Sequence, residues 1–190
     1  MMNLKGAIFL GVLVFGFLTA GAQTEVDYQH KRLVKTLKKE GIANPGVLRE
    51  MVVPDALSNG RSINGKYFQV EPTPAGSVKY VYVGRVNSCR TGGCSISNEP
   101  PEEGSSEYFD YFIFFDQNRI IIRVSVFNYQ ATHGHEVTAR GWLKQFVGHE
   151  GSRSLQIDKN IDSISGATIS VHAITTDVEV KTTLLNQILN

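Results

Sequence analysis

The sequence has little cysteine, little tryptophan and almost no net charge. Its 190 residues include 2 Cys, 1 Trp and 6 Pro, and 19 Lys and Arg oppose 18 Asp and Glu, which gives a formal charge of +1. So balanced a charge excludes the basic surface typical of a nucleic-acid-binding module. Because 42% of the residues are apolar, the composition also excludes a disordered tail. One globular domain that needs neither a metal nor a disulfide to fold is expected.

The N-terminal residues have the features of an export signal. Lys5 is the only charged residue among the first 22, and an uncharged apolar run covers residues 7–17. Ala20 and Ala22 have the small side chains that a signal peptidase accepts, and the apolar run is too short to span a bilayer core of about 30 Å. The sequence therefore predicts a signal peptide over residues 1–22 and a periplasmic or secreted mature protein. An uncleaved anchor is the alternative.

Export would change the interpretation of charge and of the two cysteines. Loss of residues 1–22 removes Lys5 and no acid, so the mature chain is neutral, with 18 basic and 18 acidic residues. Cys89 and Cys94 would lie in an oxidising compartment, and the glycines between them allow a tight loop. A local disulfide is predicted. A redox-active dithiol is the alternative, and two sulfurs alone make a zinc site a weaker one.

Hydrophobic periodicity predicts a single α+β domain with a mainly antiparallel sheet and helices packed on it. Leu33, Val34 and Leu37 recur at helical spacing before Gly41. Two apolar segments separated by the turn residues 116–118 predict a β-hairpin at the centre of the sheet. The expected segments are a helix over 29–40, a strand over 78–86, hairpin strands over 108–115 and 120–129, and a helix from 167 onward. Residues 23–77 are assigned to the first helix and a connecting segment, and residues 78–190 to the main domain.

The start of the last helix has the features of an anion-binding site. Ser165 is a good N-cap residue, so the amides of Gly166, Ala167 and Thr168 are expected at the positive end of the helix dipole. Small side chains at two of these positions would let a phosphate approach the backbone, within reach of the Thr168 hydroxyl. An ordinary capped helix start is the alternative on these grounds alone.

Residues 162–170, DSISGATIS, match the pattern D-x-x-[ST]-G-A-[ST]-x-[ST] at every specified position. With average residue usage, a chance match in a chain of this length has a probability on the order of 10⁻⁴. The chain therefore resembles the FMN-binding domain family, which includes subunits of the sodium-pumping NADH:quinone oxidoreductase and of Rnf-type complexes. The resemblance implies that a flavin transferase moves FMN from FAD onto the Thr168 hydroxyl as a phosphoester. It implies recognition or binding roles for Asp162, Ser165, Gly166, Ala167 and Ser170.

A second segment is similar to the family's E-T-P-G-hydrophobic-G loop, without its proline. By position, the resemblance implies cofactor contacts from Glu136, Thr138, Gly141 and Trp142. His172 follows Thr168 by one helical turn, where it could bind the phosphate or be solvated. His133, His135 and Glu136 have side chains that can bind a metal, but nothing else in the sequence completes a ligand set, and no metal site is predicted.

These patterns predict an exported flavoprotein electron carrier, an electron-transfer domain rather than a stand-alone enzyme, with no catalytic residue of its own. Its expected partners are a flavin transferase and a redox donor and acceptor, which could include a membrane electron-transfer complex; nucleic acid is not among them. The alternative is a periplasmic binding or interaction module of the same fold without covalent flavin. A third hypothesis couples Cys89 and Cys94 to the flavin as a dithiol relay.

Overall fold

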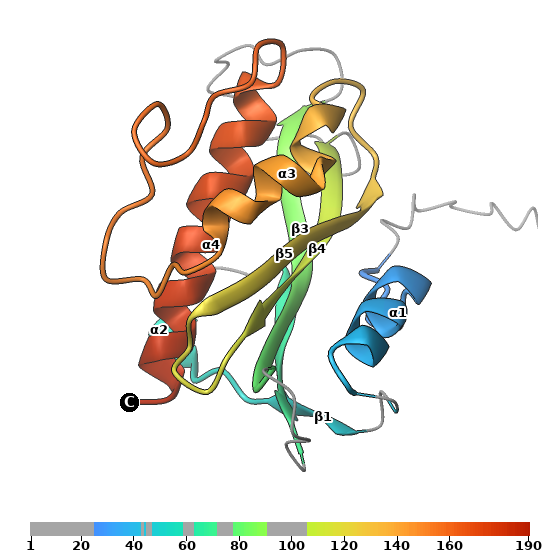
Figure 1. Cartoon of the computed structure of the whole chain (residues 1–190), viewed down its shortest axis with the longest axis vertical. Helices are drawn as coiled ribbons and strands as arrows, with labels where there is room; N and C mark the ends of the chain where they lie inside the picture. Colours follow the sequence, from blue (N-terminus) through green and yellow to red (C-terminus); the bar gives the residue numbers. More distant parts are fainter. Residues whose placement is uncertain (1–24, 43, 45–46, 59–62, 72–77, 91–105) are drawn as a thin grey trace, which may run out of the picture.

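Five strands form one antiparallel sheet in the order β1-β2-β3-β4-β5, and helices cover both of its faces (Figure 1). The computed structural model describes residues 25–190 apart from 43, 45–46, 59–62, 72–77 and 91–105. The strands are β1 (Leu48–Met51), β2 (Gly65–Val70), β3 (Tyr80–Arg90), β4 (Ser106–Phe115) and β5 (Ile121–Tyr129). The predicted α+β class with a mainly antiparallel sheet is confirmed.

The first helix, α1, packs on one face of the sheet, and the longest helix, α4, packs on the other face. The helices are α1 (Lys31–Lys39), α2 (Asp55–Ser58), α3 (Arg140–Leu143) and α4 (Thr168–Ile188), with short 3-10 helices η2 (His135–Thr138) and η3 (Lys144–Phe146). The predicted first and last helices are thus confirmed. None of the helices in the described part of the chain combines the length and apolar character needed to cross a bilayer.

The continuous apolar run of β4 follows from burial on both faces. Phe112 and Phe114 pack with Leu33 of α1 in one cluster, whereas Tyr111 and Ile113 pack in the cluster beneath α4. Successive side chains of a strand point to opposite faces, so a strand covered on both sides reads as an unbroken hydrophobic segment.

The predicted hairpin is confirmed, but its place in the sheet differs from the prediction. Asp116 closes the turn, since its Oδ1 accepts from the backbone N–H of Asn118 at 2.8 Å and of Ile120 at 2.9 Å. β3 lies at the centre of the order, and β5 is an edge strand. The prediction that the hairpin forms the centre was wrong because β5 is apolar for another reason: α3 and η3 cover one of its faces, although only β4 pairs with it.

Gly41 ends α1 as its sequence indicates. Its φ is +85°, and the bonds Gly41 N–H to Lys38 O and Ile42 N–H to Leu37 O form a Schellman motif. Ile42 is buried directly after this turn. The amphipathic helix therefore stops where the chain must fold back toward the sheet.

β1 and β2 lie in residues 23–77, where the sequence predicts only a first helix and a connecting segment. Arg49 and Glu50 fill half of β1, and β2 is short, with glycines close to its start, so neither segment shows a long alternating pattern. Pairing across the sheet supplies what local propensity lacks: Tyr67 of β2 lies opposite Tyr82 of β3 and is fully buried.

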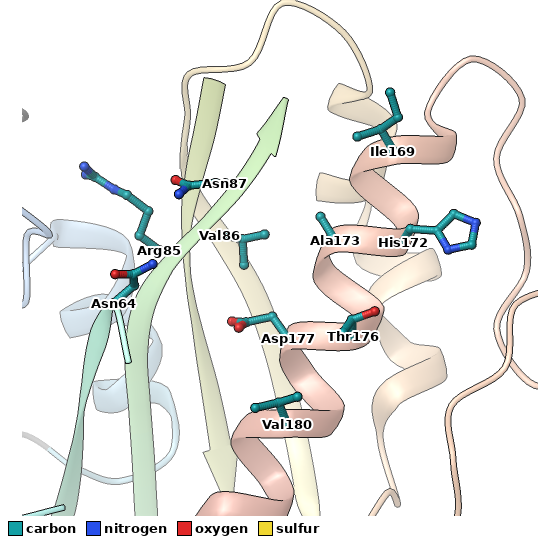
Figure 2. Close-up of a pocket in the computed structure, with 10 residues that line it drawn as sticks. All are labelled: Asn64, Arg85, Val86, Asn87, Ile169, His172, Ala173, Thr176, Asp177 and Val180. Atoms are coloured by element: carbon teal, nitrogen blue, oxygen red, sulfur yellow. The ribbon is translucent and has the colours of Figure 1, made fainter. Parts of the chain in front are cut away.

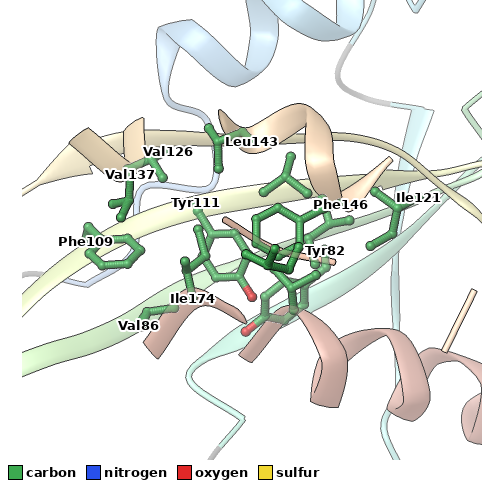
Figure 3. Close-up of a cluster of buried hydrophobic side chains, with 14 of the residues drawn as sticks. Tyr82, Val86, Phe109, Tyr111, Ile121, Val126, Val137, Leu143, Phe146 and Ile174 are labelled. Carbon is green, nitrogen blue, oxygen red and sulfur yellow. The ribbon is translucent and has the colours of Figure 1, made fainter. Parts of the chain in front are cut away.

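Buried tyrosines fasten α4 to the sheet. The Tyr67 hydroxyl donates to the backbone carbonyl of Lys181 at 2.8 Å, and the Tyr111 hydroxyl donates to Asp177 Oδ2 at 2.6 Å. Lys181 Nζ in turn lies 3.0 Å from Asp177 Oδ1. Burial raises the pKa of Tyr111 well above its usual value, so its hydroxyl stays protonated and can donate. Figure 3 shows the rings of Tyr82 and Tyr111 inside the apolar cluster.

A buried ion pair joins β3 to β4 on the opposite face. Arg85 Nε lies 2.7 Å from Asp110 Oδ1, and the two side chains are 9% and 1% exposed. The Asn128 amide donates to Asp110 Oδ2 at 2.8 Å, and the guanidinium stacks 3.6 Å from the ring centre of Tyr108. Each charge of the pair is therefore compensated in the folded chain.

Asp110→Ala is expected to lower the free energy of unfolding by about 3–5 kcal/mol, because it leaves a buried guanidinium without its partner. The matched control is Glu50→Ala, which breaks the pair with Lys66 where both side chains are largely exposed. That change should cost no more than about 1 kcal/mol. Urea denaturation of both variants measures the difference. Equal losses would show that the Arg85 pair contributes no more than a surface pair.

Candidate functional site

A tight turn precedes α4 and positions the predicted motif. The Ala167 N–H donates to the Ile164 carbonyl at 3.0 Å, and Gly166 has a φ of +79° with open space where a Cβ would project. Ala167 is the N-cap residue of α4 and provides no side-chain cap. The prediction that Ser165 caps the helix was therefore wrong: the positive φ of Gly166 closes a turn at residues 164–167, and the helix begins only after it.

The unpaired amides at the start of α4 belong to residues further along the chain than predicted, and anion binding by them stays a prediction. The first bond of the helix runs from the Val171 N–H to the Ala167 carbonyl at 2.9 Å. The N–H groups of Thr168, Ile169 and Ser170 find no acceptor within the described part of the chain. No acidic side chain occupies the first turn. These amides at the positive helix end can bind a phosphate.

Thr168 lies beside a hollow of about 240 Å³ in which the helix start meets two other parts of the fold. Its side chain is exposed, and the small neighbours Gly166 and Ala167 leave its hydroxyl accessible. The lining residues come from the ends of β3 and β4, the loop before η2, and the motif itself: Ser88, Glu107, His133, Gly134, Gly166, Ala167, Thr168, Ile169 and Ser170.

The loop before η2 packs closely against the first turn of α4. The Tyr129 hydroxyl donates to the His133 carbonyl at 2.5 Å and lies 3.1 Å from Ser170 Oγ, which therefore donates to it. Burial raises the pKa of Tyr129, so this hydroxyl keeps its proton. Gly134 has a φ of +84°, and a Cβ there would lie 2.5 Å from Ser170 Oγ. Only glycine allows so close an approach.

Trp142 binds the start of the motif, whereas the cofactor contact that the resemblance implies for it stays a prediction. Its indole Nε1 donates to the Asp162 carbonyl at 2.8 Å, and Gln145 Oε1 accepts from the Asp162 N–H at 2.7 Å. The Trp142 ring also meets Phe146 edge-on, with 5.4 Å between centroids. Trp142 and Gln145 together fix the chain at the beginning of the motif.

The structure brings together part of the predicted site. Gly166, Ala167, Thr168 and Ser170 line the hollow, whereas Asp162 and Ser165 precede these residues in the chain and do not line it. The hollow is not lined by the four residues for which the loop similar to E-T-P-G-hydrophobic-G predicts cofactor contacts: Glu136, Thr138, Gly141 and Trp142. Cys94 lies outside the described residues, and so do residues 1–22, so the disulfide with Cys89 and the signal peptide stay predictions.

Sequence reasoning did not assign Ser88, Glu107 or Gly134 to the site, and it considered His133 only for a metal. Ser88 and Glu107 are adjacent only through the pairing of β3 with β4, which no local pattern reveals. In the sequence, only the isolated Gly134 indicated a turn or a close backbone approach in this segment. Among the described residues, no three His, Cys, Asp or Glu side chains gather as metal ligands.

A larger groove of about 620 Å³ lies between β3 and the first half of α4 (Figure 2). Ile169, which is 44% exposed, lines both this groove and the hollow at Thr168. Val86 and Ala173 give the groove apolar walls, and Asp177 also lines it, with Val180 below Asp177 in Figure 2. Figure 2 shows the His172 ring directed away from β3, so it does not fill the groove.

An α+β domain with an uncapped helix start, an exposed hydroxyl and an adjoining groove with apolar walls has the features expected of a site for a phosphorylated ligand. Residues 104–180 match the family model of the FMN-binding domain. They include the hairpin, the loop before η2, the turn at Gly166 and more than half of α4. No curated protein is significantly similar to the chain. The chain thus contains a domain of the FMN-binding family, and the cofactor of this domain is FMN.

Gly134→Ala is expected to destabilise the protein more than Gly148→Ala. Both glycines have positive φ, which costs another residue about 1–2 kcal/mol. At Gly148 nothing lies within 4 Å of the new methyl group, whereas at Gly134 it meets Ser170 Oγ. The clash adds about 1–3 kcal/mol. Urea denaturation compares the two variants, and equal losses would contradict the close packing of the loop on α4.

Proposed function

We propose that the protein is an exported flavoprotein electron carrier whose FMN is joined to Thr168 through a phosphoester. The observation that carries the proposal is the exposed Thr168 side chain at the first position of α4, beside helix amides without an acceptor in the described chain. The matching FMN-binding domain and the complete attachment pattern of residues 162–170 support it. A flavin transferase would install the cofactor.

The chemistry of attachment fits the surroundings of Thr168. A bond forms between Thr168 Oγ1 and the phosphorus of the FMN half of FAD, the pyrophosphate bond breaks, AMP leaves, and the hydroxyl proton is released. The resulting phosphodiester keeps one negative charge. At a helix N-terminus such a charge is stabilised by about 0.3–1 kcal/mol. No atom of the described residues lies within 4 Å of the position that a Cβ of Gly166 would occupy, so the turn beside Thr168 leaves space for a transferase.

The groove between β3 and α4 can receive the flavin ring. Its volume of about 620 Å³ lies within the range of ordinary cofactor and ligand sites. Ile169 connects it to the hollow at Thr168, so a phosphate and a ring could occupy adjoining spaces. FMN, when bound, supplies the transfer of one or two electrons. The described residues provide apolar contacts, and the groove opens to solvent at exposed residues such as Val180, where redox partners could approach.

Thr168→Ala is expected to abolish covalent flavin, because the variant lacks the attacking oxygen. The protein is co-expressed with a flavin transferase, denatured, separated on a gel and examined for flavin fluorescence. Thr168→Ser should retain fluorescence because it keeps a hydroxyl. Ser163→Ala removes an exposed hydroxyl at an unspecified position of the motif and should also retain it. Fluorescence in Thr168→Ala would assign the acceptor elsewhere. A colourless wild type would favour the binding-module alternative.

Export and the disulfide between Cys89 and Cys94 are tested on protein from the envelope of its own host. The intact mass is expected to correspond to a chain that begins at Gln23, carries FMN and lacks the two hydrogens of the thiols. Reduction should restore those hydrogens and leave the flavin attached. A mass that includes residues 1–22 would contradict cleavage. Two thiols that react with iodoacetamide before reduction would contradict the disulfide.

A further inference from the structure

A second groove, with a volume of about 1030 Å³, runs along β5 between α1 and the segment of α3 and η3. Figure 1 shows α1 and α3 on opposite sides of β5. Residues Ile122, Arg123, Val124 and Ser125 of β5 form part of its lining. Basic side chains surround it: Arg32, Lys35 and Lys39 from α1, Arg123 from β5, and Arg140 and Lys144 from the opposite side.

The positive charge of this basic groove is largely uncompensated. No acidic residue lines it, and of its basic side chains only Arg123 has an acidic partner among the described residues, Glu40 at 2.8 Å. The chain as a whole carries a formal charge of only +1. Six of its 19 Lys and Arg residues therefore converge on one surface feature. Such concentration favours an anionic occupant.

The floor of the groove is the outer edge of the sheet. β5 pairs only with β4, so its other edge presents backbone N–H and C=O groups. At Ile121 these groups bond to His149 O and the Gly148 N–H, at 2.9 and 2.8 Å. For residues 122–125, the described part of the chain shows no such bond on the outer edge. An extended segment could continue the pairing there.

We infer that the basic groove binds an acidic, extended segment of a protein partner, which adds to β5 as a sixth strand. The strand edge supplies backbone bonds, and the basic walls select acidic side chains. A flat lipid surface would reach the rims of a groove better than its floor, and the volume exceeds what a single phosphate fills. Such a partner could also exchange electrons with the flavin, and this part of the inference rests on the proposed function. Arg140 and Trp142 share α3, and Trp142 binds Asp162 of the flavin motif, so a partner in the groove lies close to that motif.

The test measures binding of a fluorescein-labelled peptide of alternating Glu and Thr to the mature protein by fluorescence anisotropy at low salt. The peptide should bind, and an otherwise identical peptide of Lys and Thr should not. A third peptide keeps every Glu but has alternate backbone nitrogens methylated. It should bind at least about 10-fold more weakly, because N-methylation removes the donors that strand pairing requires. Equal binding of the methylated peptide would overturn strand addition.

A charge-reversal pair locates the binding surface. Lys35→Glu with Arg140→Glu, one residue from each wall, should weaken peptide binding at least about 10-fold. The matched control is Arg153→Glu with Lys159→Glu, which makes the same change in net charge at exposed residues outside the groove. It should lose far less. Equal losses in the two variants, or tight binding to phosphatidylglycerol vesicles without peptide binding, would overturn the inference.

The Thr168→Ala variant separates this inference from the proposed function. The basic groove does not include Thr168, so peptide affinity should equal that of the wild type. Unchanged affinity supports the groove as the binding site, whether or not the wild type carries flavin. A loss of peptide binding in Thr168→Ala would overturn the assignment to this groove.

Discussion

The position of the flavin site depends on how α4 is held against the sheet. Tyr67 and Tyr111 bind Lys181 and Asp177 near the middle of this helix, and the Asp177–Lys181 pair connects the two contacts. Loss of one partner of a buried pair leaves an uncompensated charge, which costs several kcal/mol. These polar contacts lie within an apolar interface, so the helix has few alternative rotations or shifts along its axis.

A helix fixed in this way defines where its N-terminus lies. Ser170 comes to rest against Gly134 and Tyr129, so the loop before η2 forms one wall of the hollow at Thr168. Trp142 meanwhile holds the Asp162 carbonyl, on the chain that enters the turn at Gly166. Three segments far apart in sequence thus converge near the Thr168 hydroxyl. Little of the site depends on long, mobile side chains.

Local signals predicted those parts of the fold whose cause is local. Helical spacing and Gly41 predicted α1, turn residues predicted the hairpin, and the motif around Thr168 predicted FMN. What failed depends on tertiary contacts. β1 and β2 are held by cross-strand partners, and Glu107 reaches the site only through the pairing of β4 with β3. Ser165 was assigned as a cap from residue type alone, although the φ of Gly166 decides where the helix begins.

Net charge gives a poor description of how this protein could meet its partners. A chain with a formal charge of only +1 lacks strong long-range steering, since its fields largely cancel beyond a Debye length of about 8 Å at physiological ionic strength. The basic groove along β5 nevertheless presents charge at closer range, where cancellation fails. The attraction between the basic groove and an acidic partner would therefore act once the two proteins have met, and it would orient the partner on the surface. Under the proposed function this matters, because electron transfer would require both a defined approach to the flavin and ready release. Exposed charges contribute little enough to affinity to permit both.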